Sequence, residues 1–192
     1  MPELFLEIGT EEIPSRFMGP ALDYLKKEMS AFFEKNRIQA NAGRVMGTPR
    51  RLVVSFAEVD DQQKDVVETY FGPNVKVAYD GDGNPTKSAL GFARGKGIGV
   101  SQLTVEKTPK GEVVCARIKK EGQPTVDILN SFLPTLIEST PFPKKMRWGN
   151  RKTSFVRPLH WIAALFGNKP LNFDFEGILC ADTSYGHRFM RA

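Results

Sequence analysis

Hydrophobic and polar residues repeat along this chain with two periods, one typical of helices and one typical of strands. Between residues 18 and 36, apolar side chains recur every three or four positions, which predicts an amphipathic helix. A similar pattern follows Thr125, which we expect to cap a second helix that Pro134 kinks or splits. Thr86 is expected to cap a short helix that runs to Arg94.

Short apolar stretches bounded by turn residues predict strands between these helices. They cover residues 4–8, 44–46, 52–57, 66–71, 103–106, 112–119, 161–166 and 171–175. Because strands and helices do not alternate regularly, the expected fold class is α+β, with mostly antiparallel short strands and a few amphipathic helices. We expect two α+β subdomains, one formed by about 1–60 with 145–192 and the other by about 65–140.

Composition indicates the cellular location of the protein but not the reaction or ligand it is made for. No apolar run approaches the ~20 residues that a membrane helix needs, so no membrane partner is expected. The first residues lack the basic segment of a signal peptide, which favours a cytoplasmic location. Cys115 and Cys180 are too few for a disulfide framework and are expected to be reduced, buried thiols.

Motifs for catalysis or metal binding are incomplete throughout the chain. His160, His187 and Cys180 lack the spacing of zinc ligands, and the acidic turn at 80–85 lacks the glycine and glutamate of a calcium loop. The glycine-rich stretch at 91–97 is one residue short of a phosphate loop. We therefore expect no catalytic residue, metal site or cofactor here.

Charge is distributed unevenly, and the asymmetry suggests a polyanionic partner. The net charge is +5, yet residues 139–173 contain no Asp or Glu. The cations of this stretch are Lys144, Lys145, Arg147, Arg151, Lys152, Arg157 and Lys169. Seven unpaired cations repel one another, so they require solvent counterions or a polyanion.

Aromatic residues within the basic stretch make RNA a specific candidate. Trp148 and Phe155 could stack on unpaired bases while neighbouring arginines bind phosphate. The candidate RNA-binding residues are Lys144, Lys145, Arg147, Trp148, Arg151, Lys152, Arg157, His160, Arg50, Arg51, Arg94 and Lys96. The alternative is a solvated basic loop whose aromatic side chains join the core. Glu11 and Glu12 are expected to pair with the Arg50–Arg51 turn or to cap the following helix.

Five sequence blocks, in order along the chain, resemble the beta subunit of bacterial-type, two-subunit glycyl-tRNA synthetase. The blocks are 6–14 (LEIGTEEIP), 47–52 (GTPRRL), 89–94 (ALGFAR), 145–149 with 155–161 (KMRWG and FVRPLHW), and 186–189 (GHRF). Because the family's beta subunit is several times longer, the resemblance implies that this chain is an N-terminal fragment.

This resemblance implies a role in a ligase, without catalysis by the fragment itself. In the family, the alpha subunit uses ATP to make glycyl-adenylate, and the beta subunit supplies recognition of tRNA(Gly). The N-terminal region is similar to the body and tail domains of archaeal CCA-adding enzymes, which hold the acceptor arm of tRNA. The implied partners are the alpha subunit, tRNA(Gly) and the remaining beta-subunit domains. The alternative is a scaffold that docks another subunit without touching RNA.

Overall fold

The computed structural model describes residues 1–109 and 111–186, which form two compact units. Unit 1 consists of Met1–Lys64 and Gln123–Ala192, and unit 2 consists of Asp65–Gly122. The chain therefore leaves unit 1 once and returns to it. The sequence predicted the α+β class, which the observed helices and largely antiparallel strands confirm. The proposed likeness to CCA-adding enzymes stays a prediction.

Unit 1 is built on a seven-stranded sheet with the order β2-β3-β1-β7-β10-β9, in which β8 pairs with β7. Its strands are β1 (Leu4–Thr10), β2 (Arg44–Thr48), β3 (Arg51–Phe56), β7 (Leu159–Phe166), β8 (Lys169–Pro170), β9 (Asp174–Phe175) and β10 (Ile178–Ala181). All of these pairings are antiparallel except that of β10 with β7. The central strand β1 lies between β3 and β7, which come from opposite ends of the sequence.

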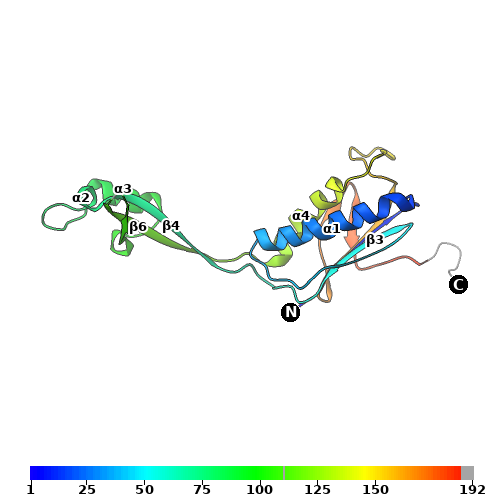
Figure 1. Cartoon of the computed structure of the whole chain (residues 1–192), viewed down its shortest axis with the longest axis horizontal. Helices are drawn as coiled ribbons and strands as arrows, with labels where there is room; N and C mark the ends of the chain where they lie inside the picture. Colours follow the sequence, from blue (N-terminus) through cyan, green and yellow to red (C-terminus); the bar gives the residue numbers. More distant parts are fainter. Residues whose placement is uncertain (110, 187–192) are drawn as a thin grey trace. The chain divides into compact units, whose positions relative to one another are not determined.

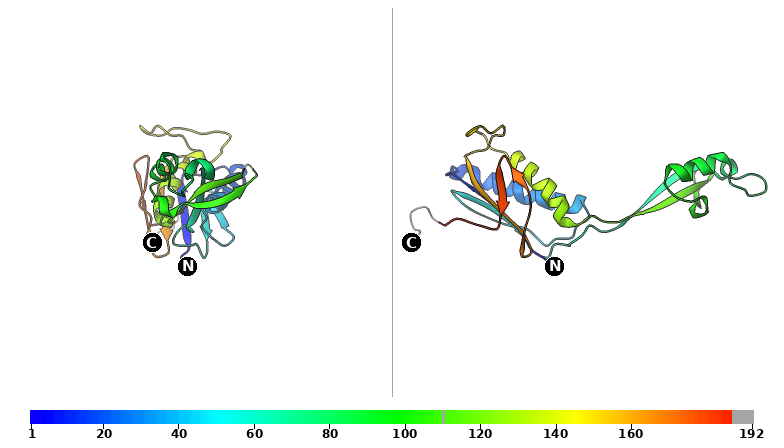
Figure 2. Two further views of the ribbon diagram at one scale, coloured as in Figure 1. Left: turned by 90° about the vertical axis from the view of Figure 1, so that its left-hand side faces the viewer. Right: turned by 180° about the vertical axis from the view of Figure 1, so that it is seen from behind.

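Two amphipathic helices, α1 (Ser15–Lys35) and α4 (Thr125–Ser139), cover one face of this sheet (Figure 1 and Figure 2). Alternate residues of β1, Leu4, Leu6 and Ile8, are fully buried and join the helices in a single core. The intervening residue Glu7 lies opposite Val53 and Ala163, on the other face of the sheet. Strand periodicity thus separates an apolar face from one that carries a carboxylate.

Side-chain caps are the local feature that the sequence predicted least well. Thr125 is already the first helical residue of α4, and its hydroxyl donates to the main-chain oxygen of Asp60 instead of capping. Thr86 is the N-cap residue of α3, as expected, but its hydroxyl donates to the carbonyls of Val77 and Ala78 and not to a helix amide. In both cases a carbonyl outside the helix takes the hydroxyl that a local side-chain cap would use. The helix α4 also continues through Pro134 and is not split.

Unit 2 is a three-stranded antiparallel sheet with the order β4-β6-β5. Its elements are β4 (Val66–Asn74), α2 (Val75–Ala78), α3 (Lys87–Gly95), a 3₁₀ helix at Val100–Gln102, β5 (Thr104–Thr108) and β6 (Gly111–Lys120). The helices lie over the sheet, and their small residues Ala78 and Ala89 pack with Val114 in a small core. The predicted hairpin is present as β5 and β6.

The observed division differs from the expected subdomains in the placement of α4. The sequence grouping assigned residues up to about 140 to the inserted part, but α4 belongs to unit 1. Its side chains Leu129, Leu133 and Ile137 are fully buried in the core of unit 1, which explains the assignment. The strand expected at 171–175 is also shorter, since only Asp174–Phe175 pairs as β9. No helix within the described residues is both long and apolar enough to cross a membrane.

Candidate nucleic-acid interface

Three of the five sequence blocks meet at the end of β1. The Thr10 amide donates to the Arg50 carbonyl at 2.9 Å, and the Glu11 amide donates to the Pro158 carbonyl at 3.0 Å. A further main-chain hydrogen bond of 2.6 Å joins Ile13 to Pro49. The loop after β1 is therefore fastened on one side to the turn between β2 and β3, and on the other to the segment that enters β7.

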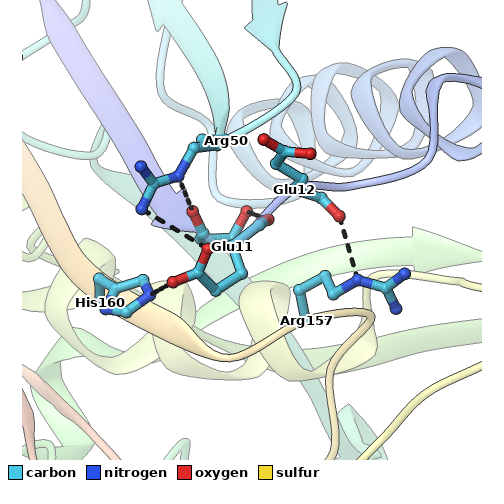
Figure 3. Close-up of polar contacts among 6 residues, drawn as sticks. Glu11, Glu12, Arg50, Arg157 and His160 are labelled. Carbon is cyan, nitrogen blue, oxygen red and sulfur yellow. Dashed lines mark hydrogen bonds and ion pairs between the residues drawn. The ribbon is translucent and has the colours of Figure 1, made fainter. Parts of the chain in front are cut away.

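Glu11 is the centre of an ion-pair cluster at this junction (Figure 3). Its carboxylate lies 3.7 Å from Nη2 of Arg50 and 2.8 Å from Nε2 of His160. Nε of Arg50 also donates to the Thr10 carbonyl, at 3.4 Å. The predicted pairing of Glu11 with the arginine turn is thus confirmed. Arg50 and His160, both candidate RNA ligands, already have an anionic partner.

Arg157 is held in the same region by main-chain oxygens. Its Nε donates to the carbonyl of Glu12 at 3.0 Å (Figure 3), and its Nη1 donates to the carbonyl of Val156 at 3.0 Å. These bonds orient the guanidinium without neutralising it, because a carbonyl carries no net charge. Arg157 therefore remains a cation that a phosphate could approach.

Glu7 organises a second polar cluster, which the sequence did not reveal. Its side chain is only 4% exposed and accepts hydrogen bonds from Nε1 of Trp161 at 2.7 Å and from the hydroxyl of Ser184 at 2.6 Å. Arg51 lies 3.5 Å from this carboxylate and also donates to the Tyr185 carbonyl at 2.5 Å. The available signal was a single acidic residue within an otherwise apolar strand. Arg51 is consequently neutralised inside the protein.

The basic loop before β7 is closed at its base and carries exposed cations. Met146 and Phe155 exchange two main-chain hydrogen bonds, of 2.7 and 3.1 Å. Within residues 1–109 and 111–186, Lys144, Arg147 and Lys152 are exposed and their side chains make no ion pair. Unlike Arg50 and Arg51, which are paired with Glu11 and Glu7, these cations are free to attract a polyanion.

The aromatic residues of this loop differ in accessibility. Trp148 is partly buried against the core of unit 1, and Arg151 lies over its ring at 5.6 Å from the centroid. Phe155 is fully buried and packs edge-to-face on Phe142, with ring centroids 4.9 Å apart. The stacking role predicted for Phe155 is therefore wrong, because its ring belongs to the hydrophobic core. Lys145 donates to the Glu138 carbonyl at 3.0 Å.

Arg94 and Lys96 belong to unit 2. Nζ of Lys96 lies 3.7 Å from the centre of the Tyr70 ring, which is a cation–π contact. Arg94 lies in the last turn of α3 and is exposed. Both residues lie in unit 2, whereas the basic loop lies in unit 1. Their role in RNA binding stays a prediction. His187 and most of the fifth sequence block lie outside the described residues.

Two other possible roles of the described residues are metal binding and reaction through a thiol. In the described part of the chain, no group of three or more His, Cys, Asp or Glu side chains is arranged to hold a metal ion. Burial raises the pKa of the Cys115 thiol, and it raises the pKa of Cys180 to about 11. Both thiols are therefore protonated near neutral pH and are poor nucleophiles.

Comparison with known proteins identifies the family of this chain from its sequence. The family model described as glycyl-tRNA synthetase beta subunit matches residues 4–192, and this chain therefore belongs to that family. The resemblance carried by the five sequence blocks is thereby confirmed.

Curated relatives support the same assignment. The chain is 43% identical over 187 residues to the glycine–tRNA ligase beta subunit of Clostridioides difficile, and 44% identical over 188 residues to that of Syntrophus aciditrophicus. It is 46% identical over 188 residues to that of Geobacter sp. strain M21. These alignments cover 97 to 98% of this chain but only 27% of each relative. The chain thus spans about a quarter of the length of the relatives it matches.

Proposed function

We propose that this chain is a tRNA-binding, non-catalytic part of a glycine–tRNA ligase, and that it contacts the acceptor arm of tRNA(Gly). In this proposal the alpha subunit attaches glycine in an ATP-dependent reaction in the cytoplasm, and the remaining beta-subunit domains complete the assembly. The family membership supports the role in the ligase. The contact with the acceptor arm goes beyond what family membership supports.

One observation carries the proposal of RNA contact: the acid-free basic loop keeps exposed cations whose side chains form no ion pair with the described residues. The base of this loop is closed by two main-chain hydrogen bonds between Met146 and Phe155. No ion pair within the described residues neutralises its exposed side chains Lys144, Arg147 and Lys152. Lys–phosphate and Arg–phosphate contacts release counterions, which gives affinity without sequence preference. The loop is suited to the backbone of a nucleic acid.

Charge reversal tests this proposal directly. The double variant Arg147→Glu/Lys152→Glu should weaken binding of tRNA(Gly) and lower the slope of log affinity against log salt by ~0.7 to 0.9 per lost phosphate contact. Fluorescence anisotropy over a salt series measures both quantities, and aminoacylation by the intact two-subunit enzyme reports the consequence. The matched control is Lys26→Glu/Lys27→Glu, which reverses two exposed cations on α1. Equal losses in both double variants would reject a specific role for the loop.

Subunit docking is the second candidate function, and unit 2 supplies an observation in its favour. Val67 and Phe71, on one face of β4, are 58% and 60% exposed. The cations in register with this face, Arg117 and Lys119, are paired with Glu106 and Asp65. The surface therefore offers apolar area more than free charge, which favours a protein partner. Phe71→Ser should weaken capture of the alpha subunit if this face docks it, and should leave tRNA affinity unchanged.

A further inference from the structure

A cavity of about 370 Å³ opens in unit 1 between the parallel strands β7 and β10. Their registered pairs are Ile162 with Cys180 and Ala163 with Ala181. On the side where the strands begin, residues 159–161 and 177–179 pair with β1 and β9 but not with each other, and they line the cavity. The volume falls in the lower part of the range of small-molecule sites, roughly 300–1,000 Å³.

One wall of this cavity is aromatic and held rigidly. Trp161 lines the cavity, and its Nε1 is fixed by the buried carboxylate of Glu7 at 2.7 Å. The indole lies so close to Gly9 that a Cβ at this position would come within 2.1 Å of the ring. Tyr185, half exposed, lies beside it with ring centroids 5.1 Å apart. A flat ligand could therefore pack against a surface that is already ordered.

Arg151 supplies a cation to the same cavity, and one of its donors lacks a partner. Its Nη1 is buried without a hydrogen bond, as are Nε1 of Trp148 and the Thr153 hydroxyl. In the described structure these are the buried side-chain polar atoms that lack partners, and all three can donate. Of these three residues Arg151 lines the cavity, and because a buried donor on a cation is costly when no acceptor meets it, its guanidinium favours an anion.

We propose that this cavity binds one unpaired ribonucleotide, with the phosphate on Arg151 and the base against the Tyr185–Trp161 wall. The proposal deepens the RNA-binding function and depends on it, since it names the part of the RNA that would enter. A cation beside an aromatic wall matches the two ends of a nucleotide. His160 also lines the cavity, where its Nε2 contacts Glu11 (Figure 3). Arg151 is the arginine of the cavity lining, and its side chain makes no ion pair with the described residues.

The test uses this chain and adenosine 5′-monophosphate, with adenosine and inorganic phosphate as partial ligands. The sequence contains two tryptophans, so their indole N–H signals in a two-dimensional NMR spectrum report two separate positions. The nucleotide should shift the Trp161 signal in a saturable way. Adenosine and phosphate should each bind at least tenfold more weakly, because each makes only part of the contacts.

Two variants address the cavity and one serves as the control. Arg151→Met should weaken nucleotide binding about tenfold by removing the cation. Leu179→Trp places bulk at a cavity-lining residue that is 73% exposed, so it should block binding without disturbing the core. Arg147→Met removes a cation of the same loop that does not line the cavity, and should leave nucleotide binding unchanged. If Arg151→Met fails to fold, Leu179→Trp decides the question.

The outcomes separate this inference from the proposed function. If the nucleotide leaves the Trp161 signal unchanged while tRNA binding remains sensitive to Arg147, the cavity proposal is overturned and RNA binding by the loop stands. If inorganic phosphate binds as well as the nucleotide, the aromatic wall has no role and the proposal is also wrong. If neither tRNA nor the nucleotide binds, both proposals fail together.

Discussion

Unit 1 and unit 2 are stabilised in different ways although one chain forms both. Unit 1 buries a continuous set of large side chains between two helices and a seven-stranded sheet. Unit 2 has a smaller buried cluster, Ala78, Ala89 and Val114, against which partly buried side chains such as Phe92 pack, and its sheet carries ion pairs such as Lys119 with Asp65. Exposed ion pairs contribute only about 0–1 kcal/mol each, so the difference in stability between the units depends mainly on buried apolar area. Unit 2, which buries less, should unfold first.

Core truncation should produce the largest difference between the units. Leu133→Ala should lower the free energy of unfolding of unit 1 by about 2–5 kcal/mol, because Leu133 is fully buried. Val114→Ala should lower that of unit 2 by about 2 kcal/mol, since it removes less side chain. Urea denaturation measures unit 1 by tryptophan fluorescence, because both tryptophans lie in it, and unit 2 by the reactivity of Cys115.

The same experiment shows whether the units unfold separately. If they do, Val114→Ala lowers the urea midpoint of the Cys115 transition alone, and Leu133→Ala lowers the midpoint of the tryptophan transition. Coincident shifts of both probes in either variant would mean that the chain unfolds as one cooperative body.

A pair of glycine substitutions sharpens the account of unit 1 with a smaller effect. Gly9→Ala should destabilise unit 1 by about 1–3 kcal/mol, because the new Cβ would overlap the Trp161 indole. Gly19→Ala is the matched control in the exposed part of α1, where nothing lies within 4 Å of the added Cβ. It should stabilise the helix by about 0.5–1 kcal/mol. Thermal unfolding followed by tryptophan fluorescence distinguishes the two signs, and equal effects would exclude the overlap.

The smallest expected effect concerns the ion pairs of unit 2 and depends on pH. A hydrogen bond from Lys119, together with one from the Gly122 amide, holds the pKa of Asp65 below its usual value. A lowered folded-state pKa contributes stability above the unfolded pKa of about 4, and this contribution is lost as the pH falls below it. Asp65→Asn should therefore slightly lower the melting temperature of unit 2 at pH 7 and have no effect near pH 2.

The control for this measurement is Asp82→Asn, at an exposed turn carboxylate that has no ion pair in the described part of the chain. It should leave the melting temperature of unit 2 unchanged at either pH. A loss for Asp65→Asn that persists at pH 2 would assign the effect to packing and not to charge.

Periodicity predicted the helices and most strands because each is encoded by neighbouring residues. The predicted helix at 18–36 is observed as α1, and strands such as β1 and β6 lie where alternation placed them. The errors occurred where a distant partner outweighed the local signal. The hydroxyl of Thr125 bonds across the fold to the Asp60 carbonyl, and the ring of Phe155 packs on Phe142 instead of facing a ligand.

The candidate site was predictable in composition but not in geometry. The basic loop and the pairing of Glu11 with Arg50 followed from the charge pattern, and the structure contains that ion pair. Glu7 was missed because its partners Trp161 and Ser184 lie 154 and 177 residues away. The sequence also could not tell which cations would be neutralised internally, since that depends on which segments the sheet brings together.

The chain leaves and re-enters unit 1 at neighbouring positions, which bears on whether unit 2 can be removed or replaced. Gln62 forms a β-bridge with Pro124, and the Gln63 amide donates to the Gln123 carbonyl at 3.0 Å, so exit and return are hydrogen-bonded neighbours. A two-residue turn suffices to join antiparallel segments at such a crossing. Unit 2 could therefore be excised or exchanged as a genetic cassette while the seven-stranded scaffold keeps its own connectivity.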